Sequence, residues 1–180
     1  MLYFRNELKD RYNSTYQIRK ALINREIYKI QNGIYSDNEF VNPLEIITKK
    51  YSNAIFTSES AFFYHDLTDV IPDKFNLATQ RTAVRIRDSS IKQLFIPNEL
   101  FKFGKSQMKV ENVIINIYDK ERMLVELIRK KNQVPFDYYK EIIFNYRKIV
   151  NQLDIYKIQD YISYYKNEET LYDTLQREVF

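Results

Sequence analysis

One tight turn constrains the fold of this chain more than any other sequence feature. The 180 residues include only two glycines, and one of them, Gly33, follows Asn32 between the short runs "EIYKI" and "GIYS". Asn-Gly between alternating apolar and polar residues is a strong signal for a β-hairpin, because both residues tolerate a positive φ. The sequence therefore predicts a hairpin, with Ile27, Ile30 and Ile34 packing inward.

Two helical patterns precede this hairpin. Residues 3–12 ("YFRNELKDRY") repeat apolar or aromatic side chains at three-to-four-residue spacing, which predicts a helix. Residues 13–27 ("NSTYQIRKALINREI") begin with potential N-caps and predict a second helix, with Ile18, Ala21, Leu22 and the stem of Arg25 on its buried face. Only a two-to-four-residue turn fits between them, as in a helix-turn-helix, and a hairpin directly after that motif is a wing.

The hairpin has two open interpretations. Lys29, Gln31 and Asn32 near its tip are polar and could reach a phosphate or the minor groove of DNA. Alternatively, the hairpin only covers the helix pair.

Charge is unevenly placed along the chain. Residues 1–36 carry seven basic and three acidic side chains, whereas residues 37–180 carry 21 of each, so the whole net charge of +4 lies in the first fifth. Such asymmetry favours a polyanionic partner, with nucleic acid first among the candidates. A solvated basic face is the other explanation.

Residues 37–43 are predicted to be a linker, and residues 42–180 a second domain. Helices are expected from Asn42 onward and in "SESAFFYHDL", and strands in "AIFT", "KFNLAT", "VRIRD", "KQLFIP" and "VIINIY". Only helical patterns follow residue 119, in 119–131, 135–150, 154–166 and 168–180. The expected fold class is α+β: a minimal N-terminal winged helix-turn-helix domain (1–36), a mixed α/β unit to about residue 118, and a C-terminal helical region.

Several kinds of chemistry lack the residues that they need. Cysteine is absent, which excludes disulfides and thiolate metal sites. The start "MLYFRNELKD" is charged within five residues, unlike a signal peptide, and no uncharged run reaches the roughly 20 residues of a spanning helix. We therefore expect a cytoplasmic protein without a membrane partner.

Catalytic motifs are equally sparse. The single histidine, His65, lies among aromatic residues and is expected to be packed and hydrogen-bonded rather than a base. No glycine-rich phosphate loop or nucleophile elbow is present, so we expect no enzyme activity, cofactor or metal. Asp66, Asp69 and Asp73 leave one alternative open, a metal-dependent enzyme acting on nucleic acid, although Asp69 and Asp73 suit a turn equally well.

Aromatic residues are abundant, with 16 tyrosines and 12 phenylalanines. Aromatics beside basic residues can stack single-stranded bases, but most of those in the last third show helical core spacing. We expect them to fill a core or contact a partner helix. The aromatics concerned are Tyr138, Tyr139, Phe144, Tyr146, Tyr156, Tyr161, Tyr164 and Tyr165.

Residues 14–36 and 42–72 together resemble the AbiEi-family antitoxins of bacterial abortive-infection toxin–antitoxin systems. The family pattern is a recognition helix, a wing ending in Gly-hydrophobic-Tyr, and a block of Ser-x-Ser-Ala, aromatic, His, Leu, Asp and Pro. The matching positions here are Gly33-Ile34-Tyr35, Ser58, Ser60-Ala61, Tyr64-His65, Leu67, Asp69 and Pro72. The helix predicted in "DKERMLVELI", residues 119–128, also looks like the one that follows the family's strands.

The resemblance implies an antitoxin with an N-terminal winged helix-turn-helix and a C-terminal antitoxin domain. Such a protein represses its own operon by binding inverted repeats in double-stranded operator DNA, as a dimer or cooperatively. It also counters a cognate nucleotidyltransferase-like toxin, directly or indirectly, in phage defence. The matched helix and wing supply the candidate DNA-binding residues, with base or phosphate contacts from Ser14, Thr15, Tyr16, Gln17, Arg19, Lys20, Asn24, Lys29, Gln31 and Asn32.

A second function class remains open. A winged-helix transcriptional regulator whose C-terminal domain senses a ligand or a protein would show the same N-terminal features.

Overall fold

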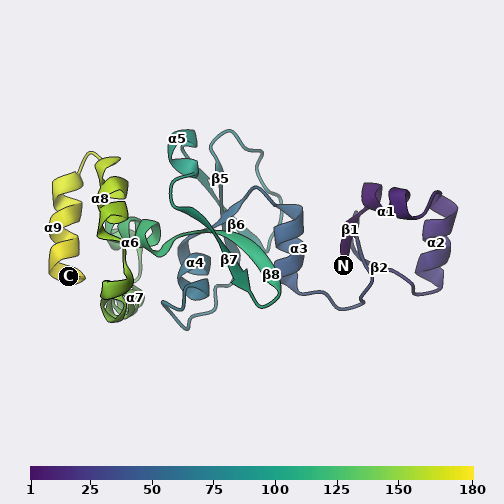
Figure 1. The fold of residues 1–180 in the computed structure, drawn as a ribbon, viewed down its shortest axis with the longest axis horizontal. Coiled ribbons are helices and arrows are strands. Elements are labelled where there is room, and N and C mark those ends of the chain that lie inside the picture. Colours follow the sequence, from purple (N-terminus) through teal and green to yellow (C-terminus); the bar gives the residue numbers. More distant parts are fainter. The chain divides into compact units, whose positions relative to one another are not determined.

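The computed structural model describes all residues from 1 to 180. It has the predicted α+β fold class, with two separate sheets, and divides into two compact units (Figure 1). Unit 1 is Met1–Ser52 and unit 2 is Asn53–Phe180. The division lies later than the linker predicted at residues 37–43, because helix α3 (Pro43–Lys50) belongs to unit 1. There Lys49 Nζ lies 2.7 Å from Glu7 Oε1.

Unit 1 contains a three-stranded antiparallel sheet of order β1-β3-β2 and three helices. The sheet includes a strand that the sequence analysis missed, since residues 2–4 pair with β3 instead of starting the first helix. Tyr3 and Phe4 suit either structure, and pairing with the hairpin decides between them. The elements are β1 (Leu2–Phe4), α1 (Arg5–Arg11), α2 (Thr15–Ile23), β2 (Tyr28–Gln31), β3 (Ile34–Ser36) and α3.

The predicted hairpin is present, and only one of its two turn residues has a left-handed backbone conformation. Gly33 has φ +80°, whereas Asn32 is not among the residues with positive φ. The register shifts between Lys29 and Gln31, so Ile30 is the extra residue of a β-bulge in β2. Ile27 and Ile34 are buried as predicted, but Ile30 is only half-buried because the bulge displaces it from the ladder.

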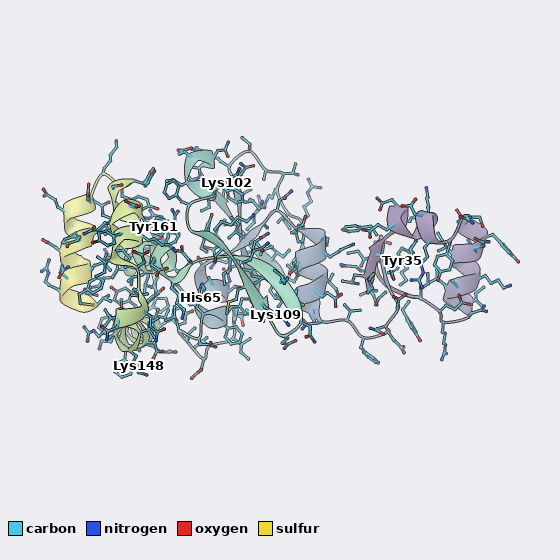
Figure 2. The ribbon with its side chains drawn as sticks, viewed as in Figure 1. Tyr35, His65, Lys102, Lys109, Lys148 and Tyr161 are labelled. Atoms are coloured by element: carbon cyan, nitrogen blue, oxygen red, sulfur yellow. The ribbon has the colours of Figure 1, made fainter.

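A small core holds the helix pair of unit 1 against the sheet. The buried side chains of Leu8, Ile18, Ala21, Ile27 and Tyr35 form one cluster, and Tyr3, Tyr12 and Leu22 pack against it. Figure 2 marks Tyr35, which lies in the central strand β3. The core therefore draws on α1, α2 and the hairpin together, so the helix pair and the hairpin form one structural piece.

Unit 2 contains a five-stranded mixed sheet of order β6-β5-β4-β8-β7. The pairs β4–β8 and β5–β6 are parallel, whereas the pairs β4–β5 and β7–β8 are antiparallel. The strands are β4 (Ile55–Phe56), β5 (Phe75–Gln80), β6 (Ile91–Ile96), β7 (Lys105–Val110) and β8 (Val113–Tyr118). The helices between strands are α4 (Ser58–Tyr64) and α5 (Asn98–Phe101).

One strand prediction in unit 2 was wrong, and one strand was missed. The segment 84–88 is an irregular loop, because the side chain of Gln93 takes the place of a strand partner: it accepts from Ile86 N at 2.7 Å and donates to the Val84 carbonyl at 3.2 Å. Strand β7 was missed, because "KSQMKV" is largely polar. Lysines on an edge strand are a common protection against pairing with other chains.

Only helices follow β8. They are α6 (Lys120–Arg129), α7 (Phe136–Lys148), α8 (Ile155–Ser163) and α9 (Glu168–Glu178), with short 3₁₀ turns at Lys131–Gln133 and Val150–Gln152. Figure 1 shows α8 and α9 side by side in yellow-green and yellow beside α6, in agreement with their mutual contacts. Helix α6 is the central one, since its residues Glu121 to Ile128 are all buried.

The prediction that the C-terminal aromatics fill a core was right for only some of them. Tyr139, Tyr146 and Tyr161 are buried, but Phe144, Tyr156 and Tyr164 are exposed. Tyr138 and Tyr165 are half-buried. Helical spacing identifies the apolar rows of a helix but does not distinguish a buried row from an exposed one.

None of the helices has both the length and the apolar character needed to cross a membrane.

Candidate nucleic-acid interface

Helix α2 starts at a side-chain cap and turns a polar face outward. Ser14 is the N-cap, and its Oγ accepts a hydrogen bond from Gln17 N at 3.2 Å, which satisfies one of the free N–H groups of the first turn. The turn between α1 and α2 is Tyr12 to Ser14, within the predicted length. The Ser14 hydroxyl still has its proton to donate, so capping leaves it able to contact a phosphate.

The exposed face of α2 holds most of the predicted contact residues. Thr15, Gln17, Arg19 and Lys20 are all exposed, and Tyr16 is 75% exposed. Asn24, the C-cap, is exposed too, but its Nδ2 donates to Glu26 Oε1 at 3.1 Å and is therefore partly engaged.

The basic side chains on this face are not neutralised within the protein. Arg19 and Lys20 make no ion pair or side-chain hydrogen bond, and neither do Arg25 and Lys29. No acidic residue lies in α2 itself. Unpaired cations on a helix with no local carboxylates suit a polyanion, because each phosphate neutralised on the partner releases a counterion.

Arg11, in contrast, is engaged within unit 1. Arg11 Nη1 lies 2.7 Å from Asp37 Oδ1 and donates to Tyr3 Oη at 2.8 Å, and Tyr3 Oη donates to Asp37 Oδ2 at 2.8 Å. Burial raises the pKa of the Asp37 carboxyl, but hydrogen bonds from Arg11 and Tyr3 outweigh burial, so the net shift of the pKa is downward. This triad ties the end of α1 to the residue after β3. It also neutralises one of the seven basic side chains in residues 1–36.

The hairpin presents a smaller polar surface than α2. Lys29 and Asn32 are exposed, while Gln31 is half-buried in the ladder opposite Ile34. Strand β2 is an edge of the sheet, whereas β3 is paired on both sides. The Gly33 carbonyl accepts a hydrogen bond from Arg5 N at 3.1 Å, which fixes the turn to the start of α1.

Two residues near the end of α2 are exposed, which the sequence analysis did not predict. Ile23, at the end of α2, is 81% exposed and lies one helical row on from Tyr16 and Lys20. Arg25 was expected to line the buried face, but it has φ +58° and is exposed, because the chain leaves the helix there. The spacing of Tyr16, Lys20 and Ile23 was visible in the sequence, whereas the left-handed backbone at Arg25 was not.

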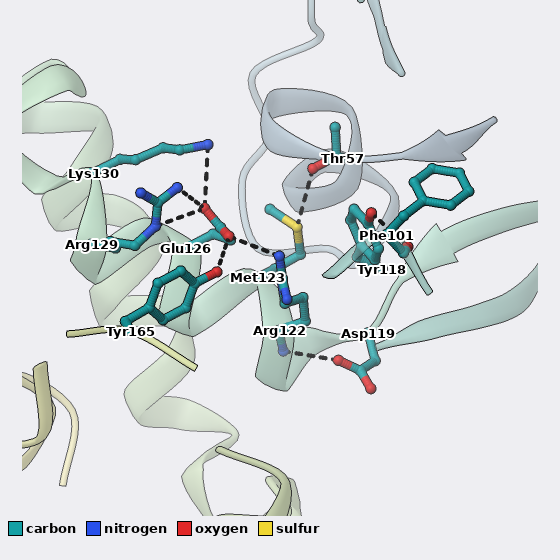
Figure 3. A network of polar contacts seen from close by, with 10 residues as sticks. All are labelled: Thr57, Phe101, Tyr118, Asp119, Arg122, Met123, Glu126, Arg129, Lys130 and Tyr165. Carbon is teal, nitrogen blue, oxygen red and sulfur yellow. Dashed lines mark hydrogen bonds and ion pairs between the residues drawn. The ribbon is translucent and has the colours of Figure 1, made fainter. Parts of the chain in front are cut away.

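Charged residues in unit 2 form a different kind of cluster, in which three cations share one carboxylate. Figure 3 shows Glu126 of α6 accepting from Arg122, Arg129 and Tyr165, with Lys130 close by. Burial alone raises the pKa of Glu126, but the charges of Lys130, Arg122 and Arg129 outweigh it and lower the pKa to about 2. Tyr165 follows α8, so this network fastens the helices to one another.

The single histidine is packed in the core of unit 2 and hydrogen-bonded, as the sequence analysis predicts. His65 ends α4 and is buried (labelled in Figure 2), and its Nε2 donates to the Tyr118 carbonyl at 2.7 Å. Burial lowers the pKa of His65, which keeps the ring neutral. Asp66, Asp69 and Asp73 are exposed, and no group of three or more His, Asp or Glu side chains is arranged to hold a metal ion.

Unit 2 also has a pocket that the sequence analysis did not predict. It measures about 700 Å³ and is lined by α4, the segment from Val70 to Lys74, the end of α6, and the start of α7. Its walls are mainly apolar, with charged groups at several points. That volume lies within the range typical of small-molecule sites, which is roughly 300–1,000 Å³.

No protein-family model matches the chain, and no curated protein matches it in sequence.

Proposed function

We propose that the chain is a DNA-binding antitoxin that acts in the cytoplasm. Unit 1 binds double-stranded operator DNA upstream of its own operon and represses transcription, and the protein counters a cognate nucleotidyltransferase-like toxin. The observation that carries the DNA-binding part is the face of α2, where Arg19 and Lys20 are exposed and unpaired beside exposed polar side chains.

The order of elements in unit 1 supports a winged helix-turn-helix. Two short helices joined by a tight turn are followed at once by an antiparallel hairpin, and the first strand of the unit completes the sheet. In such domains the second helix enters the major groove and the hairpin lies beside it. Helix α2 has the length for this role, and its unpaired cations are accompanied by no acidic residue, unlike those of α1, which also contains Glu7 and Asp10.

Each exposed side chain then has a part suited to its chemistry. Arg19, Lys20 and Lys29 neutralise phosphates, and the Ser14 hydroxyl donates to another. Thr15, Gln17 and the free amide oxygen of Asn24 contact base edges in the major groove.

Apolar contacts extend the same face. The exposed side chains of Tyr16 and Ile23 suit thymine methyl groups, which are the apolar features of the major groove. Gln31 and Asn32 at the hairpin reach the backbone or the minor groove. One domain of this size offers few base contacts, so two copies on half-sites about one helical turn apart, or cooperative binding to repeats, supply the rest of the specificity.

The antitoxin part of the proposal rests on the resemblance of residues 14–36 and 42–72 to the AbiEi-family antitoxins. No catalytic step is assigned to the chain and no cofactor is needed. Growth rescue tests this part: the chain is co-expressed with the nucleotidyltransferase-like protein encoded beside it, and restored growth is expected. Unrestored growth at matched expression levels would reject the antitoxin role.

Repression is tested by a reporter gene fused to the chain's own upstream region. The wild-type chain is expected to lower reporter output, and Arg19→Ala/Lys20→Ala to restore it. Footprinting of the same DNA should then show protected half-sites. Unchanged reporter output with the wild-type chain would reject autorepression, whatever the result of the rescue assay.

The pocket of unit 2 favours a second candidate function, a transcriptional regulator that senses a ligand. The two functions differ in the rescue assay, because a ligand-sensing regulator leaves toxin activity unchanged.

A further inference from the structure

The connection from β5 to β6 concentrates positive charge on the surface of unit 2. The two strands, both labelled in Figure 1, are parallel, and the residues that join them, 81–90, form no helix. This segment, the arginine loop, contains Arg81, Arg85 and Arg87, and all three are exposed. Its only carboxylate, that of Asp88, accepts hydrogen bonds from Ser90 N at 3.1 Å and from Ser90 Oγ at 2.6 Å.

The three guanidinium groups of the loop are not neutralised within the protein. Arg81, Arg85 and Arg87 make no ion pair and no side-chain hydrogen bond, whereas the next cation along the chain, Lys92, pairs with Glu59 at 3.0 Å. A guanidinium presents its N–H donors in a planar fork that matches the oxygens of a phosphate or a carboxylate. The loop therefore suits a partner that carries several such anions.

Hydrogen bonds hold the arginine loop in place. Gln93, in the middle of β6, accepts from Ile86 N at 2.7 Å through Oε1 and donates to the Val84 carbonyl at 3.2 Å through Nε2. At the start of the loop, Arg81 N donates to the Ile96 carbonyl at 2.8 Å. A loop that is already ordered loses less conformational entropy when it binds, so its charges contribute more to affinity.

Two of the arginines face outward together. Ile86 is half-buried, whereas Arg85 and Arg87 on either side of it are exposed. Their Cα atoms can be at most about 7 Å apart, because only one residue separates them. Two guanidinium groups at this spacing suit neighbouring phosphates of one strand.

An exposed aromatic ring lies beside the loop. Phe95 is 45% exposed, and it stands on the same face of β6 as Gln93, because side chains alternate along a strand. The hydrogen bond from Arg81 N to the Ile96 carbonyl places Arg81 next to it in the chain fold. Aromatic rings beside cations stack unpaired bases. Charge alone would suit any polyanion, and the ring is what favours a nucleic acid with unpaired bases.

We infer that the arginine loop and Phe95 bind single-stranded nucleic acid. Arg81, Arg85 and Arg87 contact phosphates of one strand, and the ring of Phe95 stacks on a base. The inference concerns unit 2 alone and does not depend on duplex binding by unit 1.

The phosphate contacts are tested by fluorescence anisotropy of the full chain with a labelled single strand of about eight nucleotides, across a salt series. Each phosphate contacted on a single strand contributes about −0.7 to the slope of log K against log salt. Arg85→Ala/Arg87→Ala should therefore make the slope less steep by about 1.4 and raise the Kd at least about tenfold.

The matched control is Arg19→Ala/Lys20→Ala, which makes the same change in charge on unit 1. It should leave the slope for the single strand unchanged. Conversely, Arg85→Ala/Arg87→Ala should leave the affinity for the upstream duplex unchanged, so that this inference and the proposed function of unit 1 can fail separately.

Stacking is tested with an abasic strand of the same length, which keeps the phosphates and lacks the bases. The wild-type chain is expected to bind the base-bearing strand at least about fivefold more tightly than the abasic one. Phe95→Leu should reduce this preference and leave the salt slope unchanged, because it removes the ring and no charge.

Ribonucleotide and deoxyribonucleotide strands of one sequence distinguish the source of the ligand. Tighter binding of the first indicates an RNA partner, and tighter binding of the second indicates single-stranded DNA. The inference would be overturned by equal loss of slope in the two double variants, by polyglutamate of matched charge binding as tightly as the strand, or by equal binding of the abasic and base-bearing strands to the wild-type chain.

Discussion

The salt dependence of DNA binding gives the most quantitative check on the proposed interface. Each phosphate neutralised by a protein cation contributes about −0.9 to the slope of log K against log salt on B-DNA. Arg19, Lys20, Arg25 and Lys29 are exposed and unpaired on α2, at its end and on β2. If each neutralises one phosphate, the expected slope is about −3.6 per protomer.

The perturbation is Arg19→Ala/Lys20→Ala, which removes two of these four cations. The slope should fall to about −1.8, so that raising salt from about 50 to 200 mM weakens wild-type binding about 150-fold but the variant only about 12-fold. Both side chains are exposed, so the fold of unit 1 should be unaffected. Fluorescence anisotropy with a labelled duplex measures both slopes.

A matched control separates a local contact from an effect of net charge. Lys102→Ala/Lys166→Ala makes the same change in charge at exposed sites in unit 2, with Lys102 marked in Figure 2. The control should keep the wild-type slope. If both double variants reduced the slope equally, α2 would not be the contact surface and the reasoning from unpaired cations would be refuted.

Three further predictions concern stability and protonation. Glu126→Gln should lower the free energy of unfolding of unit 2 by about 3 kcal/mol at pH 7, because the carboxylate has a folded pKa of about 2 against 4.5 when unfolded. The stability that this carboxylate contributes is present above pH 4.5 and is lost as the pH falls toward 2. The difference in stability between wild type and variant, measured by chemical denaturation, should therefore shrink over that pH window. Gly104→Ala should cost more stability than Gly33→Ala, although both glycines have positive φ. An added Cβ at Gly104 would lie 2.6 Å from Arg122 Cβ, whereas at Gly33 it would meet nothing within 4 Å. Equal losses of stability in thermal unfolding would contradict this prediction. His65 should remain neutral in the folded chain at pH values just below 6.5, its ordinary pKa, because burial lowers the pKa of the folded ring. Its contribution to stability should therefore be lost as the pH falls below about 6.5. An NMR titration that gave an unshifted or raised pKa for His65 would refute this prediction.

Local sequence signals predicted most of unit 1, and their physical origin explains why. The Asn32-Gly33 turn and the Ser14 cap each depend on a few neighbouring residues, so they can be recognised without knowing the rest of the fold. Strand β1 depends on pairing with β3, 30 to 34 residues later in the chain, and its two aromatic residues fitted a helical pattern equally well. The bulge at Ile30 likewise results from the register of a ladder.

The candidate site was predictable in its composition but not in its state of pairing. The sequence identifies Arg11, Arg19 and Lys20 as cations alike, but only the tertiary structure shows that Arg11 is held by Asp37 while the other two are unpaired. The pocket of unit 2 could not be predicted at all. Its lining comes from segments between residues 58 and 138, and nothing in their local patterns indicates that they meet.

The central claim is that unit 1 reads a DNA sequence through α2 and the hairpin. The most direct measurement is the affinity of the full chain for its own upstream DNA and for a scrambled duplex of the same length and composition, at one fixed salt concentration. Much tighter binding to the upstream DNA, lost in Arg19→Ala/Lys20→Ala, is the predicted result. Equal, weak binding to both duplexes would contradict the claim and would leave the basic face of α2 as a solvated surface.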